Sequence, residues 1–242
     1  MKNFFMCVLA LAVFISVGFT PLPAAGLSIT LPVSYDVSLS SDGYKADTNY
    51  GAVTHPYLLV GNNEDNQNKD PRDYETMFGF HVPPLVGVGE ELILNSASIN
   101  AYVNFVQYEG PVRIAEGNTD DWDPFQVTWN NSHDNFGAEL DSVYLGSDSL
   151  GTWTSWDISG AGAGTFADGF FTAYMYVNPV DGLSWHDFEN LECGCGNYAH
   201  LVLDYDVVPG SGAAPVPEPS TMFLMGVGLL GLVGVAKRKK RK

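Results

Sequence analysis

The chain has 242 residues, and its 28 Asp and Glu against 11 Lys and Arg give a net charge of −17. The basic residues gather at the two ends, so residues 26–208 hold four basic and 27 acidic residues, a net charge of −23. A surface this acidic repels phosphate backbones, which excludes nucleic acid as a partner.

The first 25 residues have the pattern of a secretory signal peptide. Lys2 supplies a positive start, an apolar run follows from Phe4 to Phe19, and the small residues of Pro21 to Gly26 end it. We expect cleavage after Ala25. Cys7 lies inside the apolar run and not at its end, which argues against a lipoprotein. The remainder of the chain is therefore expected to be exported by the secretory route.

Residues 26–208 have the size of one domain with its own core. Hydrophobic and polar residues alternate with period two in 74–82, 98–105 and 200–207, which is typical of half-buried antiparallel strands. Shorter strand candidates, each bounded by Gly, Pro, Asn or Asp, lie at 33–39, 57–60, 112–115, 142–145, 152–158 and 170–177. The pattern predicts an all-β fold, a jelly-roll β-sandwich, flanked by an N-terminal signal helix and a C-terminal hydrophobic sorting helix.

Aromatic residues recur through this domain in a fixed order. Asn49–Gly51 precedes Leu58–Gly61, and a middle stretch, Asn118–Asn131, contains Trp122 and Trp129 and is interpreted as a turn that leads into a short strand. Two further aromatic stretches complete the order, Trp156–Ile158 and Tyr198–Tyr205. This succession resembles the DNRLRE domain, a secreted jelly-roll family related to carbohydrate-binding modules for alginate-type polysaccharides. The resemblance implies a domain that binds extracellular polysaccharide.

The chain departs from that family at two places. The strand that is usually rich in arginine is Tyr74–Phe80 and contains no Arg, and the usual Ser-Arg-Glu of the late strand is His186–Glu189. These departures argue against a polyanion-binding site built on those arginines.

Sugar recognition on a β-sandwich requires flat aromatic faces beside amides or carboxylates. The candidates are Tyr102 and Asn104 on the polar face of their strand, Tyr108 just beyond it, and Trp153 and Trp185. Packing in the core or at a sheet edge is the alternative for each of them. For the three tryptophans of the family motifs we expect core positions, because Trp is highly buried on average; these are Trp122, Trp129 and Trp156.

Acidic residues form the second candidate site, for a structural Ca²⁺ ion. Asp120, Asp121 and Asp123 crowd one turn, and carboxylate oxygens suit Ca²⁺. Three other residues lie on terminal segments that a jelly roll could bring together, namely Asp47, Asp204 and Asp206. Solvated acidic loops are the alternative.

Two cysteines, Cys193 and Cys195, are separated by one glycine. Two cysteines outside the cell tend to oxidise, and an intermolecular disulfide is one outcome. A zinc site with His186 and His200 lacks the usual spacing of two residues between cysteines. Loop cysteines without a function are the preferred interpretation.

The C-terminal end carries a second targeting signal. After the flexible linker of residues 209–215, the motif Val216, Pro217, Glu218, Pro219, Ser220 precedes an apolar run from Met222 to Ala236 and six basic residues. A helix of fifteen residues rises about 22 Å against a hydrocarbon core of about 30 Å, and the terminal cations would stay in the cytoplasm.

Residues 216–242 resemble the PEP-CTERM sorting signal of Gram-negative bacteria. The resemblance implies recognition by an exosortase, a transient anchor in the inner membrane, and delivery to the cell surface or the extracellular matrix. An ordinary tail anchor would explain the helix and the basic end, but it would not explain the motif.

Catalytic motifs such as G-x-S-x-G, H-E-x-x-H or a phosphate-binding loop do not occur in the chain. We therefore expect a non-catalytic surface protein that binds polysaccharide. The alternatives are a structural or adhesive matrix protein that associates through Ca²⁺, and a polysaccharide lyase or hydrolase.

Overall fold

The computed structural model describes residues 26–41, 46–49, 57–64, 71–120, 122–133, 135–167, 169–191 and 194–210. The strands are β1 (Leu27–Pro32), β2 (Tyr35–Ser40), β3 (Tyr57–Glu64), β4 (Pro71–His81), β5 (Glu90–Tyr108), β6 (Gly110–Gly117), β7 (Phe136–Leu145), β8 (Trp153–Asp157), β9 (Phe170–Tyr176), β10 (Ser184–Glu189) and β11 (His200–Pro209). A single helical turn, α2 (Trp129–Ser132), and short 3₁₀ turns lie between them. The predicted all-β class is confirmed, whereas the signal and sorting helices fall outside the described residues.

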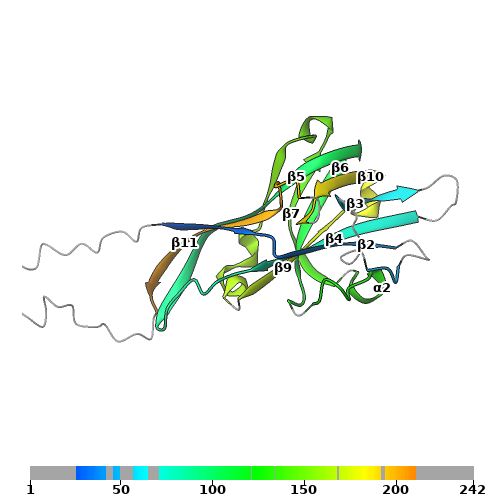
Figure 1. The fold of residues 1–242 in the computed structure, drawn as a ribbon. Helices are drawn as coiled ribbons and strands as arrows, with labels where there is room; N and C mark the ends of the chain where they lie inside the picture. The colour runs from blue at the N-terminus through cyan, green and yellow to red at the C-terminus, as the bar shows by residue number, and fades with distance from the viewer. Residues whose placement is uncertain are drawn as a thin grey trace, which may run out of the picture.

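The strands form one curled antiparallel sheet in the order β1-β11-β5-β10-β3-β4-β9-β6-β7, with β2 beside β4 and β8 beside β5 (Figure 1). The nineteen-residue β5 joins its two halves, because its first part pairs with β11 and β8 and its last part pairs with β10. The two parts of the sheet are linked across the core where the Trp156 Nε1 of β8 donates to the Val112 carbonyl oxygen of β6 at 2.9 Å. The curling brings two layers face to face, as the predicted sandwich requires.

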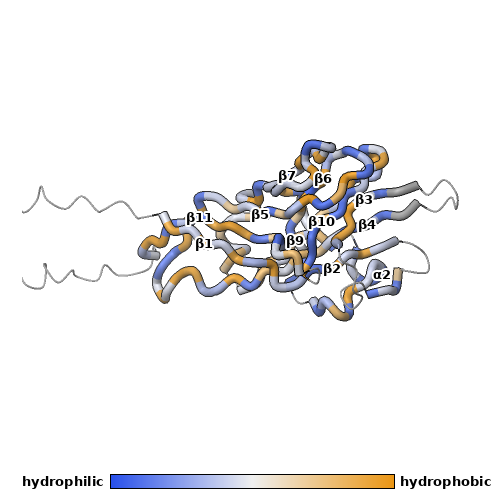
Figure 2. The backbone as a smooth tube through the Cα atoms, turned by 45° about the horizontal axis from the view of Figure 1, so that its top comes forward, coloured by the Kyte–Doolittle hydropathy of each residue, from blue (hydrophilic) through white to orange (hydrophobic). Residues whose placement is uncertain are grey.

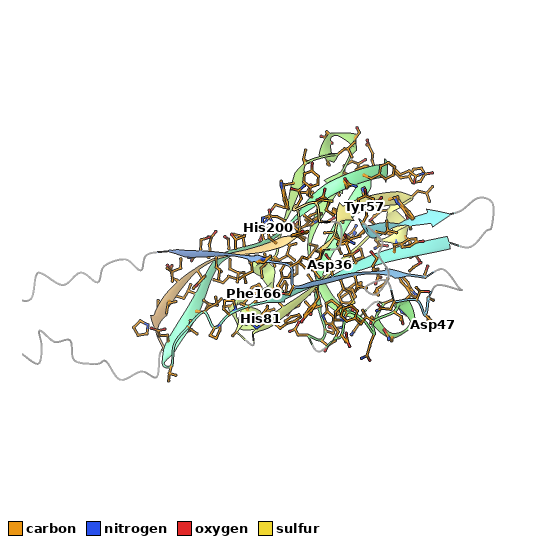
Figure 3. All side chains as sticks on the ribbon, in the orientation of Figure 1. Asp36, Asp47, Tyr57, His81, Phe166 and His200 are labelled. Atoms are coloured by element: carbon orange, nitrogen blue, oxygen red, sulfur yellow. The ribbon has the colours of Figure 1, made fainter. Side chains whose placement is uncertain are left out.

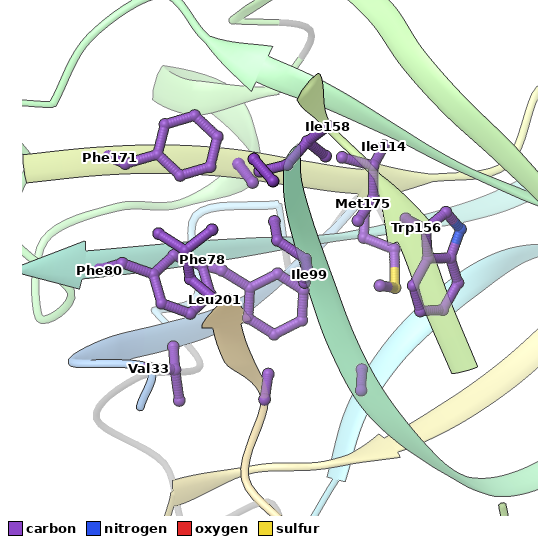
Figure 4. Packing of buried hydrophobic residues seen from close by; sticks show 14 of the residues in the cluster. Val33, Phe78, Phe80, Ile99, Ile114, Trp156, Ile158, Phe171, Met175 and Leu201 are labelled. Atoms are coloured by element: carbon purple, nitrogen blue, oxygen red, sulfur yellow. The ribbon is translucent and has the colours of Figure 1, made fainter. Parts of the chain in front are cut away.

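The core fills the space between these layers. Phe78, Phe80, Ile99, Trp156 and Leu201 are fully buried in it and come from strands of both layers (Figure 4). Hydrophobic and hydrophilic positions alternate along the strands, so that one side of each faces this core (Figure 2). Burial of each such side chain stabilises the fold by about 1.5–3 kcal/mol.

The strand β4 differs from the half-buried strand that the sequence predicts. Its residues from Tyr74 to Phe80 are buried on both faces. A second hydrophobic cluster covers the face opposite the main core and includes Val37, Met77 and Tyr174. The prediction was wrong here because the segment around α2, with Val127 and Trp129, packs over this face.

The segment 118–131 also differs from the prediction, since it forms turns and α2 instead of a strand. The Asp123 Oδ1 atom accepts a hydrogen bond from the Phe125 backbone N–H at 2.9 Å. The Asn131 Oδ1 atom accepts one from the Thr128 N–H at 2.8 Å. These local side-chain bonds satisfy backbone donors that a strand would have to pair with a neighbour.

The two ends of the described domain lie together. Leu27 of β1 pairs with Tyr205 of β11, near the last residue of that strand, Pro209 (Figure 1). His200 begins β11 and is nine residues from Pro209, about 30 Å at the rise of a strand. Within the described residues no helix is long and apolar enough to cross a membrane.

Candidate carbohydrate-binding face

Three aromatic side chains meet on the outer face of the layer formed by β1, β11, β5 and β8. Tyr102 of β5 is directly opposite Trp153 of β8, and their rings lie 5.6 Å apart with an interplanar angle of 74°. The ring of His200 from β11, labelled in Figure 3, lies 4.8 Å from the ring of Trp153 with an interplanar angle of 63°. Trp153 is 45% exposed. We call Tyr102, Trp153 and His200 the aromatic platform.

The turn before β8 fixes the position of Trp153. The Gly151 N–H donates to the Val103 carbonyl oxygen at 2.8 Å, and the Val103 N–H donates to the Thr152 carbonyl oxygen at 3.0 Å. Gly151 has a φ of 73°, a conformation that residues with a side chain rarely adopt. This tight turn lets β8 start in register with β5, and period two then directs Trp153 outward and Trp156 into the core.

Polar groups surround the platform. Asn100 of β5 pairs with His200 on one side and with Ser155 on the other, so its amide lies beside the rings. The Asn100 Nδ2 atom donates to Ser98 Oγ at 3.3 Å. Asn104 is half-buried on the same face of β5. Amides and hydroxyls at these positions can donate to and accept from the hydroxyls of a sugar whose C–H face lies on the rings.

The structure divides the five glycan candidates between two places. Tyr102 and Trp153 form the platform, with Asn104 on the same strand face. Tyr108 pairs with Trp185 where β5 meets β10. The Trp185 Nε1 atom donates to Asp187 Oδ1 at 2.9 Å, and the ring packs edge-on against Tyr74 at 4.9 Å.

Sequence reasoning did not include His200 in the platform. The alternation of 200–207 places His200 on the side of its strand opposite Leu201 and Leu203, and this is the signal that could have found it. Of the three tryptophans expected in the core, Trp156 is fully buried, which confirms the prediction. The other two, Trp122 and Trp129, are half-buried and pack on the second hydrophobic cluster.

The acidic calcium candidates have other contacts in this structure. Both oxygens of Asp123 accept bonds inside its own turn, from the Phe125 N–H and from Gln126 Nε2. Asp120 is half-buried, and Asp121 lies outside the described residues, so their joint site stays a prediction. In the part of the chain that is described, no three His, Cys, Asp or Glu side chains are grouped to hold a metal ion.

The acidic residues of the terminal segments are not brought together. Asp47 accepts from Asn130 Nδ2 at 2.7 Å, beside α2 (Figure 3). Asp204 and Asp206 instead contact β5, where they accept from Ser96 Oγ and Asn95 Nδ2. The expectation that one site includes all three was wrong, because the ends of the domain and α2 occupy different parts of the sheet.

The zinc hypothesis involved two histidines that the structure places apart. His186 is fully buried, and its Nε2 atom is 2.6 Å from Ser184 Oγ, whereas His200 lies on the aromatic platform. Burial lowers the pKa of His186 to about 4. Cys195 is disulfide-bonded, and Cys193 lies outside the described residues.

Arg113 is the one Lys or Arg whose side chain belongs to the described part of the chain. Its Nη1 atom is 2.5 Å from Glu139 Oε2, and its Nη2 atom is 2.7 Å from Asp181 Oδ2. Hydrogen bonds to Glu139 and to Asp181 raise the pKa of Arg113. Two carboxylates of the domain therefore already balance this guanidinium.

Comparison with known families supports a role in carbohydrate binding. Residues 31–172, more than half of the chain, match the model of carbohydrate-binding module family 96, and the match contains Tyr102 and Trp153. Residues 215–240 match the PEP-CTERM protein-sorting motif, which includes the five motif residues Val216 to Ser220 and indicates export. No curated protein matches the chain. These matches are compatible with the resemblance of the domain to the DNRLRE family. The chain belongs to carbohydrate-binding module family 96 and ends in a PEP-CTERM sorting motif.

Proposed function

We propose that the protein is a non-catalytic surface protein that binds extracellular polysaccharide through its aromatic platform after an exosortase has processed its tail. The observation that carries this proposal is the group of Tyr102, Trp153 and His200, in which Trp153 is exposed and the other two are half-buried, with Asn100 beside it. Monomeric soluble proteins bury most of their large aromatic rings, so three adjacent outward-facing rings favour a ligand.

The position of the platform suits a polymer outside the cell. It lies on an open sheet face, where a chain can pass with residues on both sides. His200 is also about 30 Å along β11 from Pro209, the end that leads to the sorting motif. Attachment of the tail would therefore leave the platform accessible. This geometry supports binding within a polysaccharide chain.

The charge of the domain favours a polysaccharide that is not a polyanion. Residues 26–208 carry a net charge of −23, which repels chains of uronic acid or sulfate. Arg113 is bound to Glu139 and Asp181, so it does not offer a free guanidinium to such a chain. We infer that the ligand is neutral or cationic.

Affinity electrophoresis and calorimetry of the full-length chain in mild detergent test this proposal against neutral, cationic and anionic polysaccharides. Trp153→Ala should weaken binding at least tenfold, which corresponds to about 1.4 kcal/mol. Tyr144→Ala is the matched control, because it removes an aromatic ring that is 64% exposed on β7. Equal binding by the wild type and Trp153→Ala would reject the platform.

The same preparations distinguish the alternative functions. Self-association in Ca²⁺ that EDTA reverses, without retention by any polysaccharide, would favour the structural matrix protein. Release of oligosaccharides during incubation would show that the protein is an enzyme and would overturn the non-catalytic function.

A further inference from the structure

The end of the domain from which the tail departs exposes aliphatic side chains. Val88, in the loop of residues 82–89 between β4 and β5, is 109% exposed. Leu27 at the start of β1 and Ile93 of β5 are each 45% exposed. Both are opposite residues of β11 that lie three or four positions before the end of that strand. We call Leu27, Val88 and Ile93 the apolar tip.

Hydrogen bonds hold the loop of the apolar tip in a fixed shape. The Glu90 N–H donates to the Gly87 carbonyl oxygen at 3.2 Å, and the Gly87 N–H donates to Glu90 Oε2 at 2.6 Å. Gly89 has a φ of 82°, a conformation that residues with a side chain rarely adopt. Leu85 packs against the core at the base of the loop. A tight turn therefore holds Val88 away from the rest of the domain.

The chain leaves the domain beside this loop. The Gly210 N–H donates to the Gly89 carbonyl oxygen at 2.8 Å, and β11 ends beside the start of β5 (Figure 1). Eleven residues, 211–221, separate Gly210 from the apolar run that begins at Met222. At full extension they reach at most about 40 Å. The apolar tip therefore stays near the membrane for as long as the sorting motif anchors the chain there.

The charges at this end decide which lipids it can approach. The loop of residues 82–89 contains no charged side chain, whereas Glu90 and Glu91 next to it are exposed. Anionic headgroups would repel these two carboxylates. A bilayer of zwitterionic lipids carries no net charge and offers an apolar environment just below its headgroups. Zwitterionic lipid is therefore the surface that suits both the valine and the acids beside it.

We propose that the apolar tip rests on the lipid bilayer while the uncleaved chain is anchored, with Val88 in the interface and with Leu27 and Ile93 beside it. A whole myristoyl chain gives only marginal membrane binding, so these side chains alone bind weakly. The short tether compensates, because it raises the effective concentration of the tip at the surface. Once the tail is cut, the contact no longer holds the domain. The proposal concerns the precursor and does not depend on the ligand of the aromatic platform.

Fluorescence quenching tests this contact with the full-length chain in phosphatidylcholine vesicles, in which part of the lipid carries bromine near the top of its acyl chains. The fluorescence that Val88→Trp adds to the wild-type signal should fall by about twofold or more in the brominated vesicles. Tyr144→Trp is the matched control, because Tyr144 is 64% exposed on β7, at the other end of the strand order from β1. Equal quenching of the two added tryptophans would overturn the proposal. Stronger quenching in vesicles of anionic phosphatidylglycerol would overturn the choice of a zwitterionic surface.

Hydrogen exchange gives a second measurement without an added tryptophan, since tryptophan itself favours membrane interfaces. In the same vesicles, the backbone amides of residues 85–89 should exchange about twofold or more slowly in the wild type than in Val88→Asp. Val88 is fully exposed, so this substitution leaves the packing of the domain intact. Equal exchange in both proteins would overturn the proposal. Protection that rises with protein concentration would assign the tip to a second copy instead, and protection that requires an exosortase in the vesicles would assign it to that enzyme; either result would overturn the bilayer as the partner.

Discussion

Buried His186 should make the fold lose stability between pH 6.5 and pH 4. Its side chain is fully buried, its Nε2 atom is 2.6 Å from Ser184 Oγ, and its Nδ1 atom has no hydrogen-bond partner among the described residues. Desolvation lowers its pKa from 6.5 to about 4. Above pH 6.5 the imidazole is neutral in both states, so the full stability is present.

As the pH falls below 6.5, the unfolded chain binds a proton that the folded chain does not bind until about pH 4. The contribution of His186 to the free energy of unfolding therefore decreases through this window and stops changing below it. At 1.36 kcal/mol per pH unit, the difference of about 2.5 units between the two pKa values gives a loss of about 3 kcal/mol.

Urea unfolding at pH 7 and pH 4 measures this loss. Many carboxylates also titrate near pH 4, so the relevant quantity is the difference between the wild type and His186→Gln. The glutamine amide keeps a hydrogen-bonding group near Ser184 and does not titrate. The wild type should lose about 3 kcal/mol more than the variant between the two pH values. The same pH dependence in both proteins would refute the reasoning.

Two further predictions concern the contact across the core and the charge of the domain. Trp156→Ala should lower the free energy of unfolding by about 3–5 kcal/mol in urea titrations, because it empties a fully buried site and removes the bond to Val112. The exposed Trp153→Ala serves as control, and equal losses of stability in both variants would contradict this role of Trp156. Arg113→Met should lower the free energy of unfolding by about 1 kcal/mol at low salt and by less at high salt, because it breaks two partly exposed ion pairs. The same loss of stability at high salt would argue against an electrostatic origin. Polysaccharide binding by this variant should stay as in the wild type.

The sequence predicted correctly which side chains are buried where a strand has one buried face. In β5, Ile99, Ala101 and Val103 are buried, and Tyr102 and Asn104 face outward as expected. It predicted poorly where other segments cover a strand. The residues of β4 alternate like a half-buried strand, yet the region of α2 buries its second face. Coverage of this kind depends on segments far away in the chain, which periodicity does not report.

The aromatic residues show the same difference between what local sequence predicts and what distant segments decide. Trp129 belongs to a sequence motif and was expected in the core, but it lies half-buried against the second hydrophobic cluster. Phe136 and Tyr176 had no sequence signal as neighbours, because each is an ordinary aromatic strand residue until the sheet places their ring centres 4.5 Å apart.

By itself the sequence indicated export through its sorting motif, the all-β class, and the direction in which Tyr102 and Trp153 point. Charge, hydropathy and period two are local properties of a chain, so they can be read without knowledge of its neighbours. Only the tertiary structure decided that Tyr102 lies opposite Trp153 and that β11 adds His200 to them. These contacts join residues that are about 50–100 positions apart, and their register follows from packing the whole sheet.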